Sequence, residues 1–359
     1  MSNALILEGI RLFEDTLTQD RGRISRASLL YNIANGYHTI FQSRLSNGAN
    51  LVAPNDDDLR KAKQYYREAL AETKGNSPSL RTQIFVNYGN CLSLLGRTFE
   101  AIDAFSAAID LEPQNGMAAG NLGLALDRVA DITGRYLHYY LLEAHQSINT
   151  ALGAESHLSY GGLNAAIGFR EKLKELQEII DAHEHKPQPL KKVSLSDPRS
   201  TKDRYVLFCL KHKLFLNAWA GDQYVMPAIS DEIDYGSLTV KLSQTQTVSE
   251  LLRILNEIKE AYSTARYLFY LSHLESGVLD KISSLTSYLT TQGEELNGLQ
   301  IGLCKSAYTR AFDVLDKVGR IVNVYFKIGK ARDSFWDVLA EKQSRGQAHE
   351  IRFVARPSV

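Results

Sequence analysis

The sequence predicts an all-α protein, with an N-terminal α-solenoid followed by a C-terminal helical bundle. Apolar residues recur at intervals of three and four, the spacing that places them on one face of a helix. No segment alternates apolar and polar residues between turn residues, so no β-strand is predicted. A repeated helical unit in the N-terminal half and two long apolar stripes in the C-terminal half separate the two parts.

The chain has 359 residues, which corresponds to two or three domains at about 150 residues each. Three of its eight prolines lie between residues 183 and 202, and proline is excluded from helix interiors. We therefore predict a helical-repeat domain over 1–182, a proline-rich linker over 183–202 and a helical bundle over 203–359.

Charge and composition exclude several classes of protein. Lys plus Arg and Asp plus Glu both number 41, so the chain lacks the excess positive charge of a protein that coats nucleic acid, and any RNA contact must be local. The sequence shows neither a membrane span nor a secretory signal. Three widely spaced cysteines, Cys91, Cys209 and Cys304, fit a reducing compartment. We expect a cytoplasmic protein without membrane contact.

The sequence gives no support for a bound cofactor or metal ion. It lacks the glycine-rich phosphate loop, the dinucleotide-binding fingerprint, the nucleophile elbow and the zinc-protease motif. His183 and His185 have no further ligands near them in the proline-rich linker. His138 and His145 lack an acidic or cysteine partner, which favours packing over metal binding.

The clearest repeated unit lies at residues 82–115. Gly89 and Ala101 are small where two antiparallel helices would approach closely, and Phe85 and Phe105 would fill the space around that contact. The unit resembles the tetratricopeptide repeat (TPR) in the size class of seven residues before its terminal Pro113, namely Phe85, Tyr88, Gly89, Leu92, Ala101, Phe105 and Ala108. Interrupted versions precede and follow it.

The TPR resemblance implies a concave groove that binds a peptide or a partner helix. Five residues near the packing positions of the first helices are candidates for that groove: Tyr31, Asn35, Asn87, Asn90 and Asn121. A carboxamide can form hydrogen bonds with a peptide backbone. The alternative is that these residues are solvated or capping residues of ordinary helix surfaces.

Two long helices are predicted in the C-terminal half. Apolar residues at helical spacing run through residues 249–275 and again through 296–328, with a shorter helix near 278–290 between them. The dense apolar run at 203–220 favours a buried helix. These helices are sufficient for the core of a bundle.

Four segments of this half resemble bacterial proteins in which TPRs precede a HEPN domain (higher eukaryotes and prokaryotes nucleotide-binding). They are LFLNAWA, IKEAYSTARYLFYLS, KSAYTRAFDVLDKVGRIVNVYFKIG and SFWDVL. The resemblance implies a four-helix bundle that forms a homodimer and, in active members, cleaves RNA without a metal ion. Such proteins are often encoded in toxin-antitoxin and phage-defence loci.

Active members of the family carry an Arg, four to six intervening residues and a His. Arg266 and His273 have this spacing and are therefore the candidate catalytic pair. Histidine would exchange a proton with the ribose hydroxyl or the leaving oxygen, and arginine would stabilise charge on the phosphate. The family places its motif on a later helix, however, and no such pair follows here. The alternative is a salt-bridged Arg266 and a His273 at a helix end.

The sequence therefore favours two functions. The first is an RNA-directed factor, of the metal-independent ribonuclease or RNA-binding type, in bacterial stress response or phage defence. The second is a non-enzymatic TPR scaffold or peptide-sensing regulator that dimerises through its C-terminal bundle.

Overall fold

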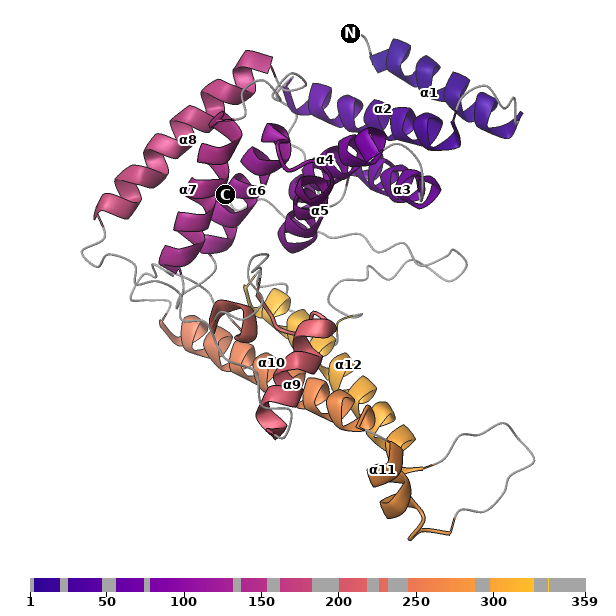
Figure 1. Ribbon diagram of the computed structural model, residues 1–359, viewed down its shortest axis with the longest axis vertical. Helices are drawn as coiled ribbons and strands as arrows, with labels where there is room; N and C mark the ends of the chain where they lie inside the picture. The colour runs from indigo at the N-terminus through magenta and orange to yellow at the C-terminus, as the bar shows by residue number, and fades with distance from the viewer. Residues whose placement is uncertain are drawn as a thin grey trace. The chain divides into compact units, whose positions relative to one another are not determined.

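The protein is described here by a computed structural model (Figure 1). It describes residues 3–19, 25–46, 56–73, 78–131, 137–153, 162–182, 200–217, 226–231, 245–274, 276–287, 298–325 and 335. All regular structure within these ranges is helical, so the predicted all-α class is confirmed. Helices α1 to α8 belong to one compact unit and α9 to α12 to a second.

The first unit is an α-solenoid. Each of its helices packs against the next one along the chain, and α2, α4 and α6 also contact one another in a row (Figure 1). The helices are α1 (Asn3–Thr18), α2 (Arg26–Ser46), α3 (Asp57–Glu72), α4 (Pro78–Leu94), α5 (Thr98–Leu111), α6 (Gly116–Ala130), α7 (Leu137–Gly153) and α8 (Gly162–Ala182).

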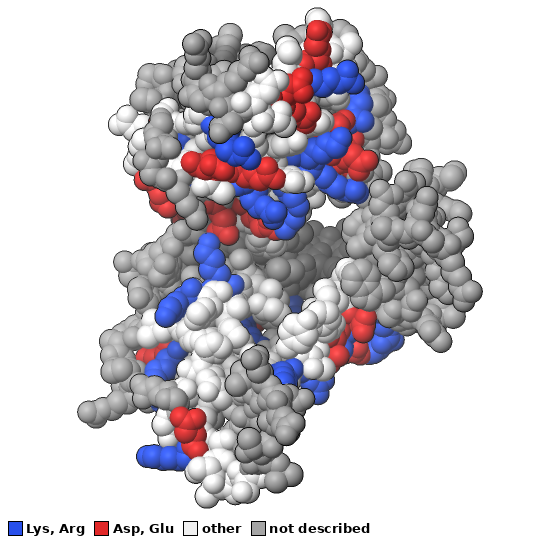
Figure 2. Space-filling model, turned by 90° about the vertical axis from the view of Figure 1, so that its right-hand side faces the viewer, with Lys and Arg blue, Asp and Glu red and all other residues white. Residues whose placement is uncertain are grey.

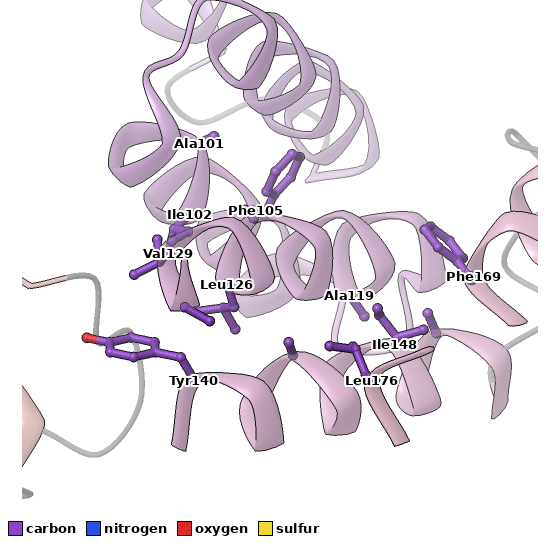
Figure 3. Close-up of a cluster of buried hydrophobic side chains, with 14 of the residues drawn as sticks. Ala101, Ile102, Phe105, Ala119, Leu126, Val129, Tyr140, Ile148, Phe169 and Leu176 are labelled. Carbon is purple, nitrogen blue, oxygen red and sulfur yellow. The ribbon is translucent and has the colours of Figure 1, made fainter. Parts of the chain in front are cut away.

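Two main apolar clusters form the core of the solenoid. The first joins α1 to α4 and contains Ile33, Leu59 and Tyr66, whose side chains have no exposed surface. The second joins α4 to α8 and includes Ile148 and Leu176, which are equally buried (Figure 3). The residues that suggested the repeat lie mainly in these clusters, and Gly89, Leu92, Ala101, Phe105 and Ala108 are all buried.

Two glycines allow neighbouring helices to approach closely. A Cβ atom at Gly89 would lie 2.4 Å from Cε1 of Phe105, so α4 and α5 could not keep their present distance with a larger residue there. A Cβ at Gly123 would lie 2.5 Å from Cγ1 of Ile148 and 2.8 Å from the carbonyl oxygen of Ala144. The second contact is with backbone, which cannot rotate away.

A Gly123→Ala variant is therefore expected to lose about 1–3 kcal/mol of unfolding free energy, because α6 and α7 must move apart to admit the methyl group. Urea denaturation followed by circular dichroism measures the loss. Gly168→Ala on α8 is the control, since nothing lies within 4 Å of its added Cβ, and it should be stabilising by about 0.5–1 kcal/mol. Equal stability of the two variants would contradict the close contact.

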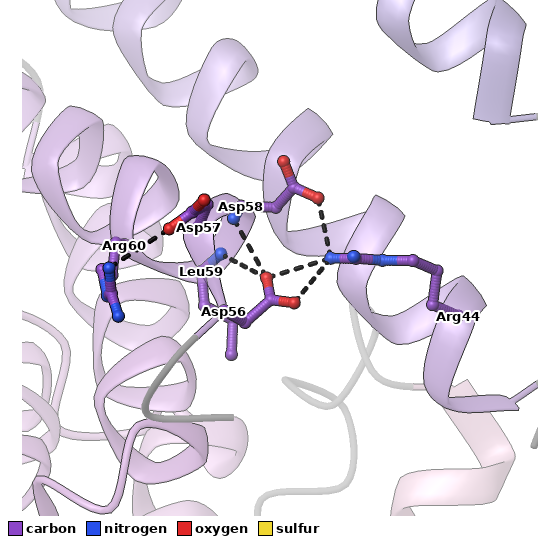
Figure 4. A network of polar contacts seen from close by, with 6 residues as sticks. All are labelled: Arg44, Asp56, Asp57, Asp58, Leu59 and Arg60. Carbon is purple, nitrogen blue, oxygen red and sulfur yellow. Dashed lines mark hydrogen bonds and ion pairs between the residues drawn. The ribbon is translucent and has the colours of Figure 1, made fainter. Parts of the chain in front are cut away.

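A polar network fixes the start of α3 (Figure 4). Asp56 is the N-cap residue, and its carboxylate accepts hydrogen bonds from the backbone N–H groups of Asp58 and Leu59 at 3.0 and 3.1 Å. Arg44, in the last turn of α2, donates to the carboxylates of Asp56 and Asp58 at 2.8 and 2.7 Å. One guanidinium therefore ties the end of α2 to the beginning of α3.

The second unit is built around two long antiparallel helices. They are α10 (Thr245–Ser272) and α12 (Leu299–Tyr325), with α9 (Thr201–Lys211), a short 3-10 helix η3 (Met226–Ile229) and α11 (Ser276–Ser283) beside them. Nε2 of Gln300 donates to the carbonyl of Ser272 at 2.8 Å, which joins the start of α12 to the end of α10. Arg320 pairs with Glu250 at 3.5 Å at the opposite ends. The predicted long helices are confirmed.

The predicted linker is described only at its end. Residues 183–199 lie outside the described part, Ser200 caps α9, and residues 201 and 202 begin that helix. The domain boundaries as a whole stay predictions. Within the described ranges, no helix is long and apolar enough to cross a membrane.

Candidate functional site

Arg266 lies on α10 inside the second unit, with 8% of its surface exposed. Its guanidinium forms a bidentate ion pair with Asp231, with Nη1 to Oδ1 at 2.7 Å and Nη2 to Oδ2 at 2.8 Å. Nε donates to the hydroxyl of Tyr205 at 2.8 Å, and Nη1 also donates to the carbonyl of Leu214 at 2.9 Å. Each of the three guanidinium nitrogens therefore donates to another group of the chain.

Aromatic rings enclose the same guanidinium. Its Cζ lies 4.8 Å from the ring centroid of Phe215, 5.5 Å from that of Tyr262 and 5.9 Å from that of Tyr205. Burial lowers the pKa of Arg266. Its hydrogen bonds and electrostatic interactions with Asp231 and Tyr205 raise the pKa by more than burial lowers it, so the net shift is upward. The side chain stays charged, and it fastens α10 to α9 and to the segment around Asp231.

His273 lies one residue beyond the end of α10 and is exposed. Its Nδ1 is 2.9 Å from the carbonyl oxygen of Phe269, which can only accept a hydrogen bond. Nδ1 therefore carries a hydrogen, and in the neutral ring Nε2 presents a lone pair. This is the state in which an imidazole can accept a proton.

A second exposed histidine lies beside it. His212 is the C-cap residue of α9, and its ring centroid is 6.3 Å from that of His273. The ring of Phe208 lies 4.5 Å from His212 and 5.5 Å from His273, and the ring of Phe269 lies 4.3 Å from His273. These four residues from two helices form what we call the imidazole cluster.

Arg266 on α10 and His273 just beyond its end have different surroundings. Arg266 is turned into the unit and held by Asp231, whereas His273 is exposed in the imidazole cluster. These contacts agree with the alternative given in the sequence analysis, in which Arg266 is a salt-bridged helix residue. A catalytic role for the two as a pair stays a prediction.

In the first unit, three of the five predicted groove residues meet. Nδ2 of Asn87 donates to the hydroxyl of Tyr31 at 2.8 Å and to Oδ1 of Asn35 at 3.0 Å. The remaining two form a pair, with Nδ2 of Asn121 donating to Oδ1 of Asn90 at 2.8 Å. All five are half-buried and lie on α2, α4 and α6, so they form a polar row along these helices.

A buried histidine extends this row. The hydroxyl of Tyr66 donates to Oδ1 of Asn35 at 2.7 Å, and Nδ1 of His38 lies 3.3 Å from the same hydroxyl. Nε2 of His38 lies 3.4 Å from the amide nitrogen of Gln42, which can only donate. The arrangement therefore requires a neutral His38, and burial lowers its pKa to about 4.

Lowering the pH from about 7 to about 4 is expected to destabilise the first unit by on the order of 2–3 kcal/mol through His38. The unfolded histidine binds a proton at its ordinary pKa of 6.5, and the folded one only near about 4. Between these values the unfolded chain binds more protons, so stability is complete above the higher value and is lost as the pH falls toward the lower one.

Urea denaturation at successive pH values measures this effect. A His38→Gln variant keeps hydrogen-bonding groups but has no proton to gain in this range, so the same measurement should give a flatter pH profile. Identical profiles for the variant and the parent protein would show that another group is responsible.

Sequence reasoning missed Asp231, Tyr205 and His212. Nothing in the local sequence distinguishes Asp231, because its bond to Arg266 joins segments 35 positions apart. His212 had a signal: FCLKH at 208–212 and FYLSH at 269–273 share the pattern Phe-x-x-x-His, which stacks the two rings on one helix face.

The surface charges are mixed. Figure 2 shows acidic and basic side chains beside one another among the coloured residues, without a continuous patch of one sign. Exposed ion pairs such as Arg26 with Glu72 and Arg310 with Asp313 contribute to this pattern. It agrees with the balanced charge of the sequence.

Comparison with known proteins adds one finding. Residues 242–355 match the family model described as LA2681-like HEPN, whereas a comparison with curated proteins gave no match. The matched region contains α10, α11 and α12, and therefore Arg266 and His273. It begins after α9, so His212 and Asp231 lie before it. The predicted resemblance is confirmed for this region, and the TPR resemblance stays a prediction. Residues 242–355, in the C-terminal part of the chain, are thus similar to the LA2681-like HEPN family.

Proposed function

We propose that this protein is an RNA-directed factor whose C-terminal unit binds RNA and cleaves it without a metal ion. The observation that carries this proposal is the LA2681-like HEPN match over the antiparallel pair α10 and α12. The exposed imidazoles at the end of α10 supply proton-transferring groups in the same unit. We place the protein in the cytoplasm, in a stress response or phage defence, as a homodimer through this unit.

RNA carries its own nucleophile, which is why side chains are sufficient for this reaction. The ribose 2′-hydroxyl attacks the adjacent phosphate once a base removes its proton, and an acid protonates the leaving oxygen. Positive groups near the phosphate stabilise the charge that develops. Balanced overall charge is compatible with this, because only the site itself needs to attract the backbone.

The test uses the purified full chain and an end-labelled single-stranded RNA in the presence of a metal chelator. The expected products end in a 2′,3′-cyclic phosphate on one fragment and a 5′-hydroxyl on the other. Arg310→Ala removes only an exposed ion pair and is the control variant, which should behave as the parent does. If the chain does not cleave RNA, the proposed ribonuclease activity is wrong, and if it does not bind RNA either, the whole proposal is wrong.

A second candidate function is peptide recognition by the solenoid, and it is supported by the polar row along α2, α4 and α6. Its amides bond to one another in the free protein, and a peptide backbone could replace those partners. A peptide array probed with the full chain tests it. The expected result is binding that Asn87→Ala and Asn121→Ala weaken, and uniform binding by both variants would contradict a groove at these residues.

A further inference from the structure

We propose that His212 and His273 are the proton-transferring pair of an RNA-cleaving site at the adjoining ends of α9 and α10. The inference rests on the proposed ribonuclease function and gives it a specific site. It replaces the pairing expected from spacing along one helix with a pairing between two helices.

Each of the two histidines belongs to the same local arrangement, Phe-x-x-x-His. Phe208 and His212 at the end of α9, like Phe269 and His273 at the end of α10, stand four positions apart, so each phenyl ring packs against its own imidazole. The centroids of the two phenyl rings lie 5.7 Å apart, and their contact holds the two Phe-x-x-x-His arrangements together. The cluster thus contains two copies of one arrangement, each ending in an imidazole.

The exposure of the two rings sets them apart from the other described histidines. His38 is buried, and His138 and His145 are half-buried, whereas His212 and His273 are both exposed. Within the described part of the chain, the exposed imidazoles are therefore gathered at one place. Solvent exposure is what a group needs in order to meet a polymer such as RNA.

The distance between the rings suits a bridging group. Their centroids are 6.3 Å apart, too far for a direct hydrogen bond, which requires about 2.7–3.2 Å between heavy atoms. Because both rings are exposed, neighbouring atoms of one bound substrate can contact the two imidazoles at the same time. The bond from Nδ1 of His273 to the carbonyl of Phe269 fixes the ring and leaves Nε2 to act on the RNA.

The reaction balances without an external reagent. One neutral imidazole takes the proton of the 2′-hydroxyl, the 2′-oxygen bonds to phosphorus, and the bond from phosphorus to the 5′-oxygen breaks. The other imidazole, protonated at the start, gives its proton to that leaving oxygen. The products are a 2′,3′-cyclic phosphate and a 5′-hydroxyl, and exchange with water restores the two rings.

The neighbouring side chains suit the same substrate. Lys211 and Lys213 flank His212 in the sequence, are exposed, and bring positive charge toward a phosphate backbone. Phe208 and Phe269 are half-buried and pack against the two imidazoles, which positions these rings. Arg266 is committed to Asp231 and Tyr205 and contributes by holding α9 against α10.

RNA cleavage by the full chain tests the pair. His212→Ala and His273→Ala are each expected to lower the cleavage rate at least about 100-fold, and the double variant to be little worse than either one. Because both side chains are exposed, the thermal unfolding midpoints should not change. His145→Ala, on α7, is the control and should retain full activity.

A readout that does not depend on catalysis uses inorganic phosphate as the probe. The imidazole NMR signals of His212 and His273 should shift together along one binding curve, and each should lose its response when the other is alanine. Failure of phosphate to shift either signal would overturn the pair.

RNA cleavage by the parent chain and by the two single variants distinguishes an error in the histidine pair from an error in the ribonuclease function. RNA cleavage that persists in both single variants overturns the histidine pair and leaves the ribonuclease function standing. If the parent chain does not cleave RNA, the ribonuclease function is wrong and the catalytic pair falls with it.

Discussion

An Asp231→Ala variant is expected to lose about 3–5 kcal/mol of unfolding free energy in the second unit, because it leaves the buried charge of Arg266 without its partner. Tyr205 and Leu214 still accept from the guanidinium, so the loss should fall toward the lower end of that range. Urea denaturation of the full chain, followed by circular dichroism, measures it.

Two further variants sharpen this test. Replacing both partners, with Asp231→Leu and Arg266→Met, should restore much of the stability, since neither change then leaves an unpaired charge. Arg310→Ala breaks an exposed pair with Asp313 and should cost about 0–1 kcal/mol. An Asp231→Ala protein as stable as its parent would mean that the ion pair does not fasten α10.

Phe105→Ala is expected to destabilise the first unit by about 3–5 kcal/mol, since it empties the space between α4 and α5. Phe105 lies in the buried apolar cluster (Figure 3) and is 1% exposed. Its ring packs directly over Gly89. The matched control is Phe312→Ala, the same chemical change at a side chain that is 46% exposed, which should cost under about 1 kcal/mol. Thermal unfolding of both variants compares them, and equal losses would contradict the central place of Phe105.

The helices and the solenoid core were predictable because their signals are local. Gly89, Ala101 and Phe105 sit within one short segment, and their sizes alone indicate two closely packed helices. Likewise, three- and four-residue spacing fixed α10 and α12 to within a few residues of their observed ends. Periodicity indicates which face of a helix is buried, and this is sufficient to predict the existence and approximate bounds of helices of this length.

The surroundings of the candidate site were not predictable in the same way. Spacing along one helix predicted the pair of Arg266 and His273, which stays a prediction, but it could not predict that Asp231 binds Arg266 or that His212 lies beside His273. Such side-chain partners depend on which segments pack together in three dimensions, and helical periodicity contains no information about this packing. The repeated Phe-x-x-x-His pattern was a signal that could have been found by comparing the ends of the two helices.

The groove residues illustrate the same limit in the first unit. Asn35, Asn87 and Asn121 lie on α2, α4 and α6, and a groove at these residues stays a prediction. That they bond to one another, and through Tyr66 to His38, depends on side-chain reach between helices.

The bond between Arg44 and the cap of α3 also has a practical consequence. Because this guanidinium and the apolar cluster shared by α2 and α3 hold the two helices together, lengthening the connection at 47–55 should leave their packing unchanged. Each doubling of a connection costs only about 0.6 kcal/mol in closure entropy. A fluorophore-binding peptide or an affinity tag can therefore be inserted there, which offers a way to follow or immobilise the protein.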